Sequence, residues 1–274
     1  MKTVERVLSL LELNKDTYLS GEEIAENLGI SRNAVWKAVN ELRKTGYDIE
    51  AVNNKGYKLA QGNDIISKQG IEAYLKKDVS DHIYVFDSLD STNNKAKELA
   101  IKGAEHGSLV VAPVQTGGRG RKDHAFFSPK GGLYMSIILD PKKIPFKKND
   151  IITAYVGISV CDAIERLTGI PVGIKGINDL YTDDKKICGI LIEAGSEFDS
   201  DTLQWLVAGI GINFDSDIEG FPEDIKRKAA SLFKPGRAAI SKNELIAGIM
   251  TNILSKEYMD EEYVMKEFKE RKKD

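Results

Sequence analysis

Residues 115–122 read QTGGRGRK, and residues 126–134 continue as FFSPKGGLY. The first stretch follows a strand-like run at residues 108–114, and the second leads into another at residues 133–139. Glycines let a backbone approach a ligand closely, and arginines present planar sets of N–H donors that match phosphate oxygens. No GxxxxGK[ST] pattern occurs, so this is not a Walker A loop. The pattern alone leaves two interpretations open: an anion-binding loop, or an exposed basic loop without a ligand.

Strand-like and helical patterns surround this loop. Strands are also expected at residues 82–86, 172–175, 186–193 and 202–209, and helices near residues 93–102, 151–167 and 242–256. Because these patterns mix without strict alternation, the sequence predicts an α+β fold around a mixed sheet.

Three other stretches place polar residues or glycines at informative positions. Residues 87–93 read DSLDSTN, which is typical of a helix N-terminus. Residues 175–181 and 184–193 read KGINDLY and DKKICGILIE, and a lysine entering an apolar strand indicates a nearby anion. Residues 209–213 read GIGIN, but no third glycine or opening helix follows, which disfavours a dinucleotide-binding loop.

The first sixty residues read as a separate unit. Ser20 and Glu23 fit a capping box, and Ser31 can cap the following helix. The spacing typical of helix-turn-helix proteins is present at Ala25, Gly29 and Val35. Residues 48–59 then read as a β-hairpin, so the sequence predicts a winged helix-turn-helix domain.

Charge is segregated within this unit. Residues 1–28 hold three Lys or Arg and six Asp or Glu (3 − 6 = −3), whereas residues 29–59 hold six and three (6 − 3 = +3). The basic part contains the second helix of the motif and the wing, which face phosphates in such domains. The side chains expected to contact DNA are Arg32, Asn33, Trp36, Lys37, Asn40 and Lys55. A protein-interaction module with a solvated charged face is the alternative.

Composition limits the other function classes. The chain has 274 residues and a net charge of 39 − 42 = −3, so it is no general polyanion binder. No apolar run approaches the ~18 residues of a membrane span, and no signal peptide opens the chain. The two cysteines, Cys161 and Cys188, form no CxxC, so we expect a cytoplasmic protein without a structural metal site.

A polar break at residues 61–64 predicts a DNA-binding domain at 1–62 and a second domain at 63–274.

Taken in order, these stretches resemble the bifunctional biotin protein ligase and biotin operon repressor family, also named biotin–[acetyl-CoA-carboxylase] ligase. The glycine-arginine motif of the family, GRGRxGRxWxSPxGGL, matches at residues 118–121, 128–129 and 131–133. Its Lys-Trp-Pro-Asn-Asp segment matches at Lys175, Asn178 and Asp179. Its [RK]-K-[LIV]-[AC]-G-I-L-[LIV]-E strand matches at residues 185–193, and its Ser-Thr-Asn motif at residues 91–93.

Some positions depart from the family pattern. Asp123-His124 replaces Gly-Arg, Gly176-Ile177 replaces Trp-Pro, and Phe126 replaces a tryptophan while keeping an aromatic face. The small SH3-like C-terminal domain that usually follows in the family is expected to be absent.

The resemblance implies a mixed-sheet catalytic domain of the biotin/lipoate ligase type and assigns site residues. The catalytic set is Lys186, Arg119 and Arg121. The biotin set is Ser91, Thr92, Asn93, Gln115, Arg119, Gly120, Arg121, Lys186 and Gly189. The nucleotide set is Gly118, Arg121, Phe126, Asn178, Asp179 and Asn213.

The resemblance also implies two half-reactions. Biotin and ATP, accompanied by Mg²⁺, would form biotinyl-5′-AMP, and a lysine of the biotin carboxyl carrier protein of acetyl-CoA carboxylase would then take the biotin. The winged helix would bind operator DNA as a biotin-responsive repressor, in a ligand-promoted homodimer. Two alternatives are a biotin-sensing repressor with weak or no ligase activity, and a lipoate-type acyl ligase.

Overall fold

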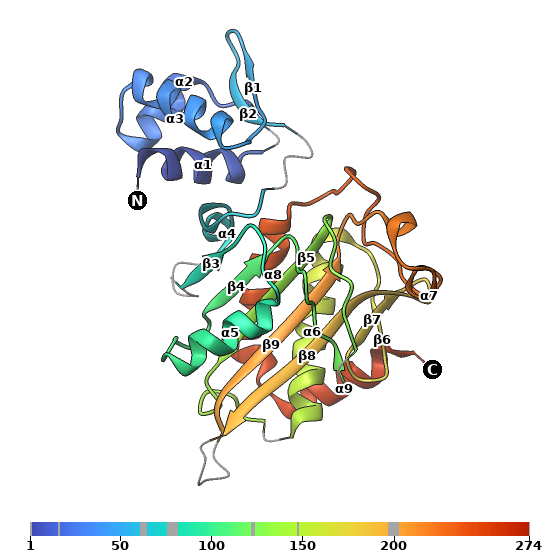
Figure 1. Ribbon diagram of the computed structural model, residues 1–274. Coiled ribbons are helices and arrows are strands. Elements are labelled where there is room, and N and C mark those ends of the chain that lie inside the picture. The colour runs from blue at the N-terminus through green and yellow to red at the C-terminus, as the bar shows by residue number, and fades with distance from the viewer. Residues whose placement is uncertain are drawn as a thin grey trace. The chain divides into compact units, whose positions relative to one another are not determined.

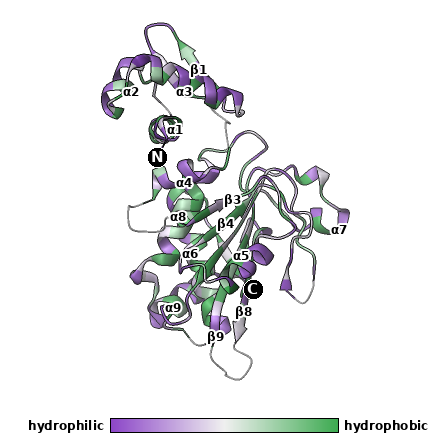
Figure 2. Ribbon diagram, turned by 60° about the vertical axis from the view of Figure 1, so that its left-hand side comes forward, coloured by the Kyte–Doolittle hydropathy of each residue, from purple (hydrophilic) through white to green (hydrophobic). Residues whose placement is uncertain are grey.

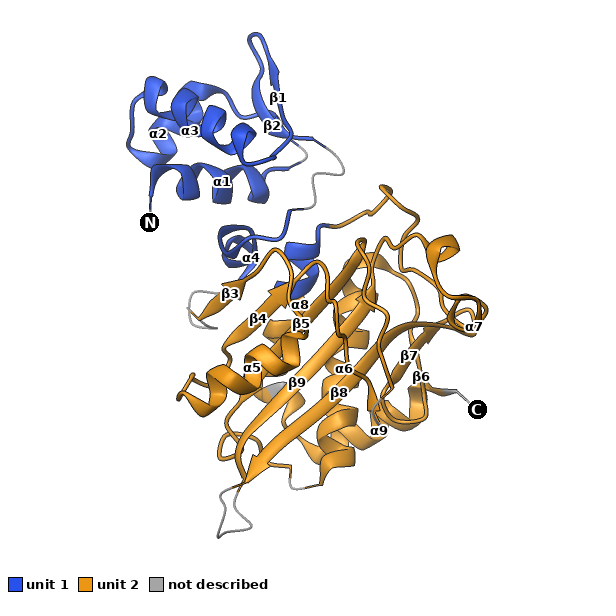
Figure 3. Cartoon of the chain, viewed as in Figure 1, with its two compact units in different colours: residues 1–76, 241–247 blue, residues 77–240, 248–274 orange. Residues whose placement is uncertain are grey.

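The computed structural model describes residues 2–15, 17–60, 65–75, 82–121, 124–146, 148–196 and 203–273. The chain divides into two compact units (Figure 3). The first contains residues 1–76 and 241–247, and the second contains residues 77–240 and 248–274. The expected boundary between residues 62 and 63 falls at residues 61–64, which lie outside the described part of the chain.

The first unit is a winged helix-turn-helix domain with an added helix. Its elements are α1 (Thr3–Leu13), α2 (Gly21–Leu28), α3 (Arg32–Lys44), β1 (Ile49–Val52), β2 (Gly56–Leu59) and α4 (Lys68–Tyr74), and the first residues of α8 (Lys242–Leu254) also belong to it. β1 and β2 pair in antiparallel register as the wing.

Local sequence signals start and end these helices as predicted. Ser20 accepts a hydrogen bond from the Glu23 backbone in a capping box, and Ser31 caps α3 through Ala34 N–H. Gly29 ends α2 at φ 62°, a left-handed conformation that glycine adopts without a Cβ clash. The apolar faces of α1, α2 and α3 then bury one core, which includes Val7, Leu11, Ile24, Val35, Val39 and Leu42.

The second unit is built on a mixed sheet. In the described residues its eight strands lie in the order β10-β6-β7-β8-β9-β5-β4-β3. Their bounds are β3 (Ile83–Val85), β4 (Leu109–Ala112), β5 (Gly132–Leu139), β6 (Gly173–Lys175), β7 (Asp179–Thr182), β8 (Lys185–Ser196), β9 (Leu203–Asn213) and β10 (Lys272–Lys273). The outer pairs β3–β4 and β6–β10 are parallel and the others antiparallel, which confirms the predicted α+β class.

Helices cover the sheet from both sides. α5 (Thr92–Ile101) packs on β4, β5 and β9, and α6 (Asn149–Thr168) packs with α9 (Glu261–Arg271) on the opposite face (Figure 1). A short helix, α7 (Glu223–Lys226), follows β9. Every residue of β4 and β5 is buried, and Figure 2 shows hydrophobic residues concentrated along the strands and α6.

Among the features that were not predicted are β7, α7, α9, β10 and the extension of β9 to Asn213. α9 has few apolar positions, and Val264 is its buried hydrophobic residue. Ion pairs hold the helix instead, because Arg271 Nη2 lies 2.7 Å from Asp162 and 3.3 Å from Glu165 on α6. Contacts of this kind connect distant segments and leave no periodic pattern in the sequence.

Candidate functional site

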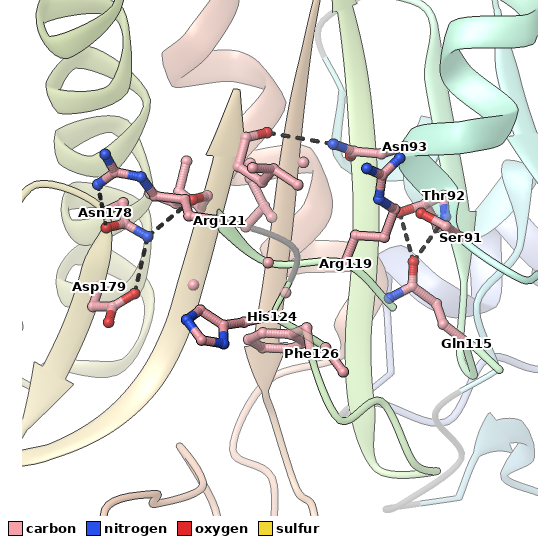
Figure 4. A pocket seen from close by; sticks show the side chains of 18 of the residues that line it. Ser91, Thr92, Asn93, Gln115, Arg119, Arg121, His124, Phe126, Asn178 and Asp179 are labelled. Atoms are coloured by element: carbon pink, nitrogen blue, oxygen red, sulfur yellow. Dashed lines mark hydrogen bonds between the residues drawn. The ribbon is translucent and has the colours of Figure 1, made fainter. Parts of the chain in front are cut away.

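A cavity of about 330 Å³ opens on the α5 face of the sheet. This volume falls in the range of small-molecule sites. Figure 4 shows Ser91, Thr92 and Gln115 on one side of the cavity and Asn178 and Asp179 on the other, with Phe126 between them. Residues from α5, the glycine-arginine loop and strands β7, β8 and β9 therefore line one pocket.

Three glycines on neighbouring strands form the floor of this pocket. Gly189 of β8 pairs with Gly211 of β9, and Gly209 lies two positions before Gly211 on β9. A Cβ at Gly189 or Gly211 would meet the Phe126 ring within 2.9 Å, and one at Gly209 would meet the Asn93 amide at 2.0 Å. The pocket and its aromatic wall thus exist because these strand positions carry no side chain.

The glycine-arginine loop places both arginines at the pocket. Arg119 Nη1 donates to Asn94 Oδ1 at 3.3 Å and lies 3.6 Å from Glu193, while Arg121 Nη1 donates to Asn178 Oδ1 at 3.1 Å. The guanidinium groups therefore approach the pocket from opposite sides. Two fixed cations on either side of one cavity suit a ligand with oxygen-bearing anionic groups.

Lys186 lies at the same end of the pocket as Asp179. Its Nζ is 2.8 Å from Asp179 Oδ1 and 5.7 Å from the centre of the Phe126 ring. The anion that this lysine meets in the structure is the carboxylate of the neighbouring strand, and its contact with a substrate phosphate stays a prediction. The Lys186 side chain is 30% exposed, so it can also reach a bound ligand.

The start of α5 is held by buried hydrogen bonds. Ser91 caps the helix, and Gln115 Oε1 accepts from Thr92 N–H at 2.7 Å. Gln115 Nε2 donates to Ser128 Oγ at 3.0 Å, and Ser128 donates to the Phe126 carbonyl at 2.8 Å. These bonds connect the helix N-terminus directly to the loop after the arginines.

Glu193 of β8 anchors the first turns of α5 to the sheet. It accepts from Asn93 Nδ2 at 2.8 Å and from Lys97 Nζ at 2.9 Å. Burial alone would raise the pKa of Glu193, but the hydrogen bonds from Lys97 and Asn93 bring it below the ordinary carboxyl value. The carboxylate is therefore ionised at neutral pH.

The pocket gathers most of the predicted site residues. All nine residues of the biotin set line it, as do Arg121, Phe126, Asn178 and Asp179 of the nucleotide set. Gly118 and Asn213 are not among its lining residues: Gly118 packs against the Phe126 carbonyl, and buried Asn213 donates to the Ala230 carbonyl. Asp123, one of the departures from the family pattern, lies outside the described residues.

Sequence reasoning missed several lining residues, namely His124, Ala125, Ile190, Leu191, Gly209, Ile210 and Gly211. The alternating glycines at 209 and 211 were the available signal, because two glycines in one strand indicate a close approach of another group. Glu193 and Ser136 behind the pocket were also missed as members of the site.

The predicted DNA face is exposed on the first unit. Arg32, Asn33, Trp36 and Lys37 are exposed on α3, with Trp36 at 56%, and Asn40 is half-buried. Lys55 of the wing is exposed, and its Nζ lies 5.8 Å from the centre of the Tyr18 ring. An exposed tryptophan among basic and amide side chains is consistent with a contact surface rather than a core position.

Two kinds of feature are absent from the described residues. No helix there combines the length and the apolar character that a membrane crossing requires. The same residues contain no group of three or more His, Cys, Asp or Glu placed to hold a metal ion.

Comparison with known proteins gives family matches in both units. Residues 85–213 match the biotin/lipoate A/B protein ligase family, and residues 3–58 match a helix-turn-helix domain family. The chain is 38% identical over 259 residues to the bifunctional ligase/repressor BirA of Bacillus subtilis, covering 93% of this chain and 78% of the relative.

Solved structures agree with these matches. The biotin protein ligase of Aquifex aeolicus in complex with biotin and ATP is 30% identical with a TM-score of 0.53, covering 70% of this chain and 74% of the other. The Leishmania major biotin protein ligase in complex with biotinyl-5-AMP has a TM-score of 0.57 at 23% identity, covering 71% of this chain and 82% of the other. The second likeness concerns the fold alone.

Proposed function

The chain belongs to the biotin protein ligase family, among its bifunctional ligase/repressor members, and from this premise we propose how its pocket works. It is a biotin–protein ligase with a DNA-binding winged helix of the repressor type. In our proposal, biotin and ATP form biotinyl-5′-AMP, and the biotin passes to a lysine of the biotin carboxyl carrier protein of acetyl-CoA carboxylase. The supporting observation is the single pocket that joins Ser91, Thr92 and Gln115 to Arg119, Arg121 and Lys186.

The first half-reaction needs charge neutralisation more than a base. The biotin carboxylate is already an anion, and it must approach the α-phosphate of ATP, which is also anionic. Arg119, Arg121 and Lys186 all line the pocket and can place positive charge where the two groups meet. Attack of the carboxylate oxygen on the α-phosphorus then forms the mixed anhydride and releases pyrophosphate.

In the second half-reaction, the lysine amine of the carrier protein attacks the acyl carbon of the anhydride and AMP leaves. The same three cations can stabilise the departing phosphate. Ser91, Thr92 and Gln115 would hold the neutral ureido ring of biotin during both steps, and Phe126 would provide an aromatic wall for the adenylate.

Mg²⁺ would enter as a companion of ATP. Mg²⁺ commonly binds through substrate phosphates, water and one or two carboxylates rather than an all-protein cage. Asp179 contributes a carboxylate to the pocket lining, and the described residues contain no cluster of three or more His, Cys, Asp or Glu that could hold a metal ion. This lining fits a Mg²⁺ ion that is held mainly by the phosphates of ATP. The ion would supply further charge neutralisation at the phosphates.

The first unit would bind operator DNA through α3 and the wing. The adenylate would favour a homodimer by ordering the glycine-arginine loop, and two winged helices would then read a palindromic operator. The repressor role would thus depend on the same ligand as the ligase reaction.

One incubation tests the ligase proposal. The protein is mixed with ATP, Mg²⁺ and a biotin carboxyl carrier domain, with either biotin or lipoate, and the carrier is measured by intact mass. We expect the mass shift of one biotin and no lipoylation. Adenylate retained on the protein without transfer would favour the sensor alternative, and a lipoyl shift would favour the lipoate-type ligase.

A further inference from the structure

The wing of the first unit carries an acidic side chain among basic ones. β1 and β2 form a hairpin that extends from the helices of this unit (Figure 1). Ile49 and Leu59 are buried in the core of the unit, so the residues next to them in each strand face outward. These outward residues are Glu50 and Lys58, which lie opposite each other in the register of the two strands.

Tyr18 lies on the same outward face. Leu19 N–H donates to the Tyr57 carbonyl at 2.9 Å, and Tyr57 N–H donates to the Leu19 carbonyl at 2.8 Å, so the segment before α2 pairs with β2. Gly56 permits this approach, because a Cβ there would lie 2.0 Å from the Leu19 carbonyl oxygen. Since Leu19 is buried, its neighbour Tyr18 faces outward beside Lys58.

The outward side chains meet at one carboxylate oxygen. The Tyr18 hydroxyl donates to Glu50 Oε2, and Lys58 Nζ lies 3.6 Å from the same oxygen. Lys58 Nζ is also 4.9 Å from the centre of the Tyr18 ring, and Lys55 Nζ is 5.8 Å from that centre. A hydroxyl donor and an ammonium group therefore converge on one anionic oxygen, and a second ammonium group lies near the same ring.

The two hydrogen-bonded residues keep the protonation states that this contact needs. The hydrogen bond from Tyr18 and the nearby charge of Lys58 hold the pKa of Glu50 below its ordinary value, and the same hydrogen bond raises the pKa of Tyr18. At neutral pH, Glu50 is therefore an anion and Tyr18 a hydroxyl donor. A phosphate oxygen of the DNA backbone takes the same kinds of partner, namely hydroxyl donors and lysine cations.

We propose that Tyr18, Lys55 and Lys58 form a phosphate-binding site on the wing. Glu50 occupies this site in the free protein and competes with DNA for it. When DNA binds, a backbone phosphate takes the place of the Glu50 carboxylate, whose side chain is 39% exposed and can turn into solvent. The inference rests on the proposed function, in which Lys55 of the wing faces DNA.

This competition separates the roles of the two hydrogen-bonded residues. Removing the Glu50 charge frees Lys58 and Tyr18 for a phosphate, and release from an exposed ion pair raises affinity by about twofold to fivefold. Removing the Tyr18 hydroxyl takes away a phosphate donor but also weakens the hold on Glu50. In the parent these two effects oppose each other, whereas without the Glu50 charge only the loss of the donor remains.

The test measures binding of a fluorescent random-sequence DNA duplex to the full-length protein by anisotropy at several salt concentrations. A random sequence suffices because phosphate contacts carry no sequence information. The variants are Glu50→Gln, Tyr18→Phe and their combination. The control is Glu261→Gln, an exposed carboxylate of α9 whose replacement changes the net charge equally.

We expect Glu50→Gln to bind the duplex about twofold to fivefold more tightly than Glu261→Gln at the same salt concentration. Tyr18→Phe should lower affinity by about tenfold in the Glu50→Gln background and by much less in the parent. Simple repulsion between Glu50 and DNA would leave Tyr18→Phe without effect in both backgrounds, and a structural role of Tyr18 would give equal losses in both.

A third substitution gives an independent measurement if the combined variant does not fold. Adding Lys58→Gln to Glu50→Gln should make the slope of the logarithm of the binding constant against the logarithm of the salt concentration shallower by about 0.9. Equal affinities of Glu50→Gln and Glu261→Gln, or equal effects of Tyr18→Phe in both backgrounds, would overturn the phosphate site alone. A parent that binds no duplex at low salt would overturn the proposed DNA-binding function as well.

Discussion

Lys186 and Asp179 face each other across the pairing of β7 and β8, with 2.8 Å between ammonium and carboxylate. Without a ligand, the carboxylate holds the lysine at the edge of the pocket. An incoming phosphate would compete for the same ammonium, so the ion pair holds the lysine at the pocket until substrate arrives.

Replacing Lys186 should therefore stop adenylation without unfolding the protein. Lys186→Ala removes a transition-state contact of about 2–4 kcal/mol, so the rate of pyrophosphate release should fall about 10²–10³-fold. Lys185→Ala, its exposed neighbour on the same strand, is the matched control. A folded Lys186→Ala protein that releases pyrophosphate at the parent rate would remove Lys186 from the catalytic set.

At the scale of single elements, α3 carries the DNA-binding hypothesis. Its buried face of Val35, Ala38, Val39 and Leu42 packs into the first unit, so its outer residues can change without loss of the core. Arg32 and Lys37 are both exposed on that outer face.

The double variant Arg32→Ala/Lys37→Ala should abolish operator binding and leave carrier biotinylation unchanged. A specific base contact contributes about 1–3 kcal/mol to the binding free energy. Loss of one phosphate contact makes the slope of the logarithm of the binding constant against the logarithm of the salt concentration shallower by about 0.9. Gel shifts at several salt concentrations measure both effects, with Lys142→Ala/Lys143→Ala, two exposed lysines of the second unit, as a charge-matched control. Unchanged operator affinity would exclude this face of α3.

The attachment of α5 to β8 should depend on pH. Glu193 has a lowered folded-state pKa, so its stabilising contribution is complete above the ordinary carboxyl value of 4.5 and is lost as the pH falls through the lower folded value. At acidic pH the free energy of unfolding of the parent should decrease as the pH falls. In Glu193→Gln this decrease, measured by urea denaturation at several pH values, should be smaller. Glu261→Gln, an exposed carboxylate at the start of α9, should keep the parent profile. Identical acid limbs for Glu193→Gln and the parent would contradict this role.

For the whole molecule, the central prediction is that ligand binding promotes dimerisation. The basic part of the winged helix, residues 29–59, carries a net charge of only +3, which is small for tight binding by one copy at physiological salt. Two copies double the charge and read a palindrome. A ligand can drive this change only through its different affinity for the two states.

We expect a mostly monomeric protein without ligand, and a dimer with higher operator affinity in the presence of biotin and ATP. Sedimentation equilibrium and gel shifts, each with and without biotin plus ATP, measure the two effects. If the oligomeric state and the operator affinity were the same with and without biotin plus ATP, the coupling between ligand binding and dimerisation would be refuted, even if the ligase activity were confirmed.

The sequence alone determined the features that depend on neighbours along the chain. The caps at Ser20, Ser31 and Ser91, the turn at Gly29 and the apolar faces of α1 to α3 arise from contacts a few residues apart. The motif resemblance further predicted both sides of the pocket, from the Ser-Thr-Asn start of α5 to Lys186. These signals are readable because helix capping and periodicity act over a single turn.

Only the tertiary structure decided which distant residues meet. The register of β8 and β9 brings Gly189 beside Gly211, and this pairing creates the pocket floor. The contacts of Ser136 with Asn93 and of Arg271 with Asp162 span β5 to α5 and α9 to α6. Such contacts follow from strand register and helix packing, which depend on the whole buried core rather than on local spacing. For that reason the hydrogen bonds that connect Glu193 to Gln115 through Asn93, Ser136 and Thr92 could not be read from the sequence.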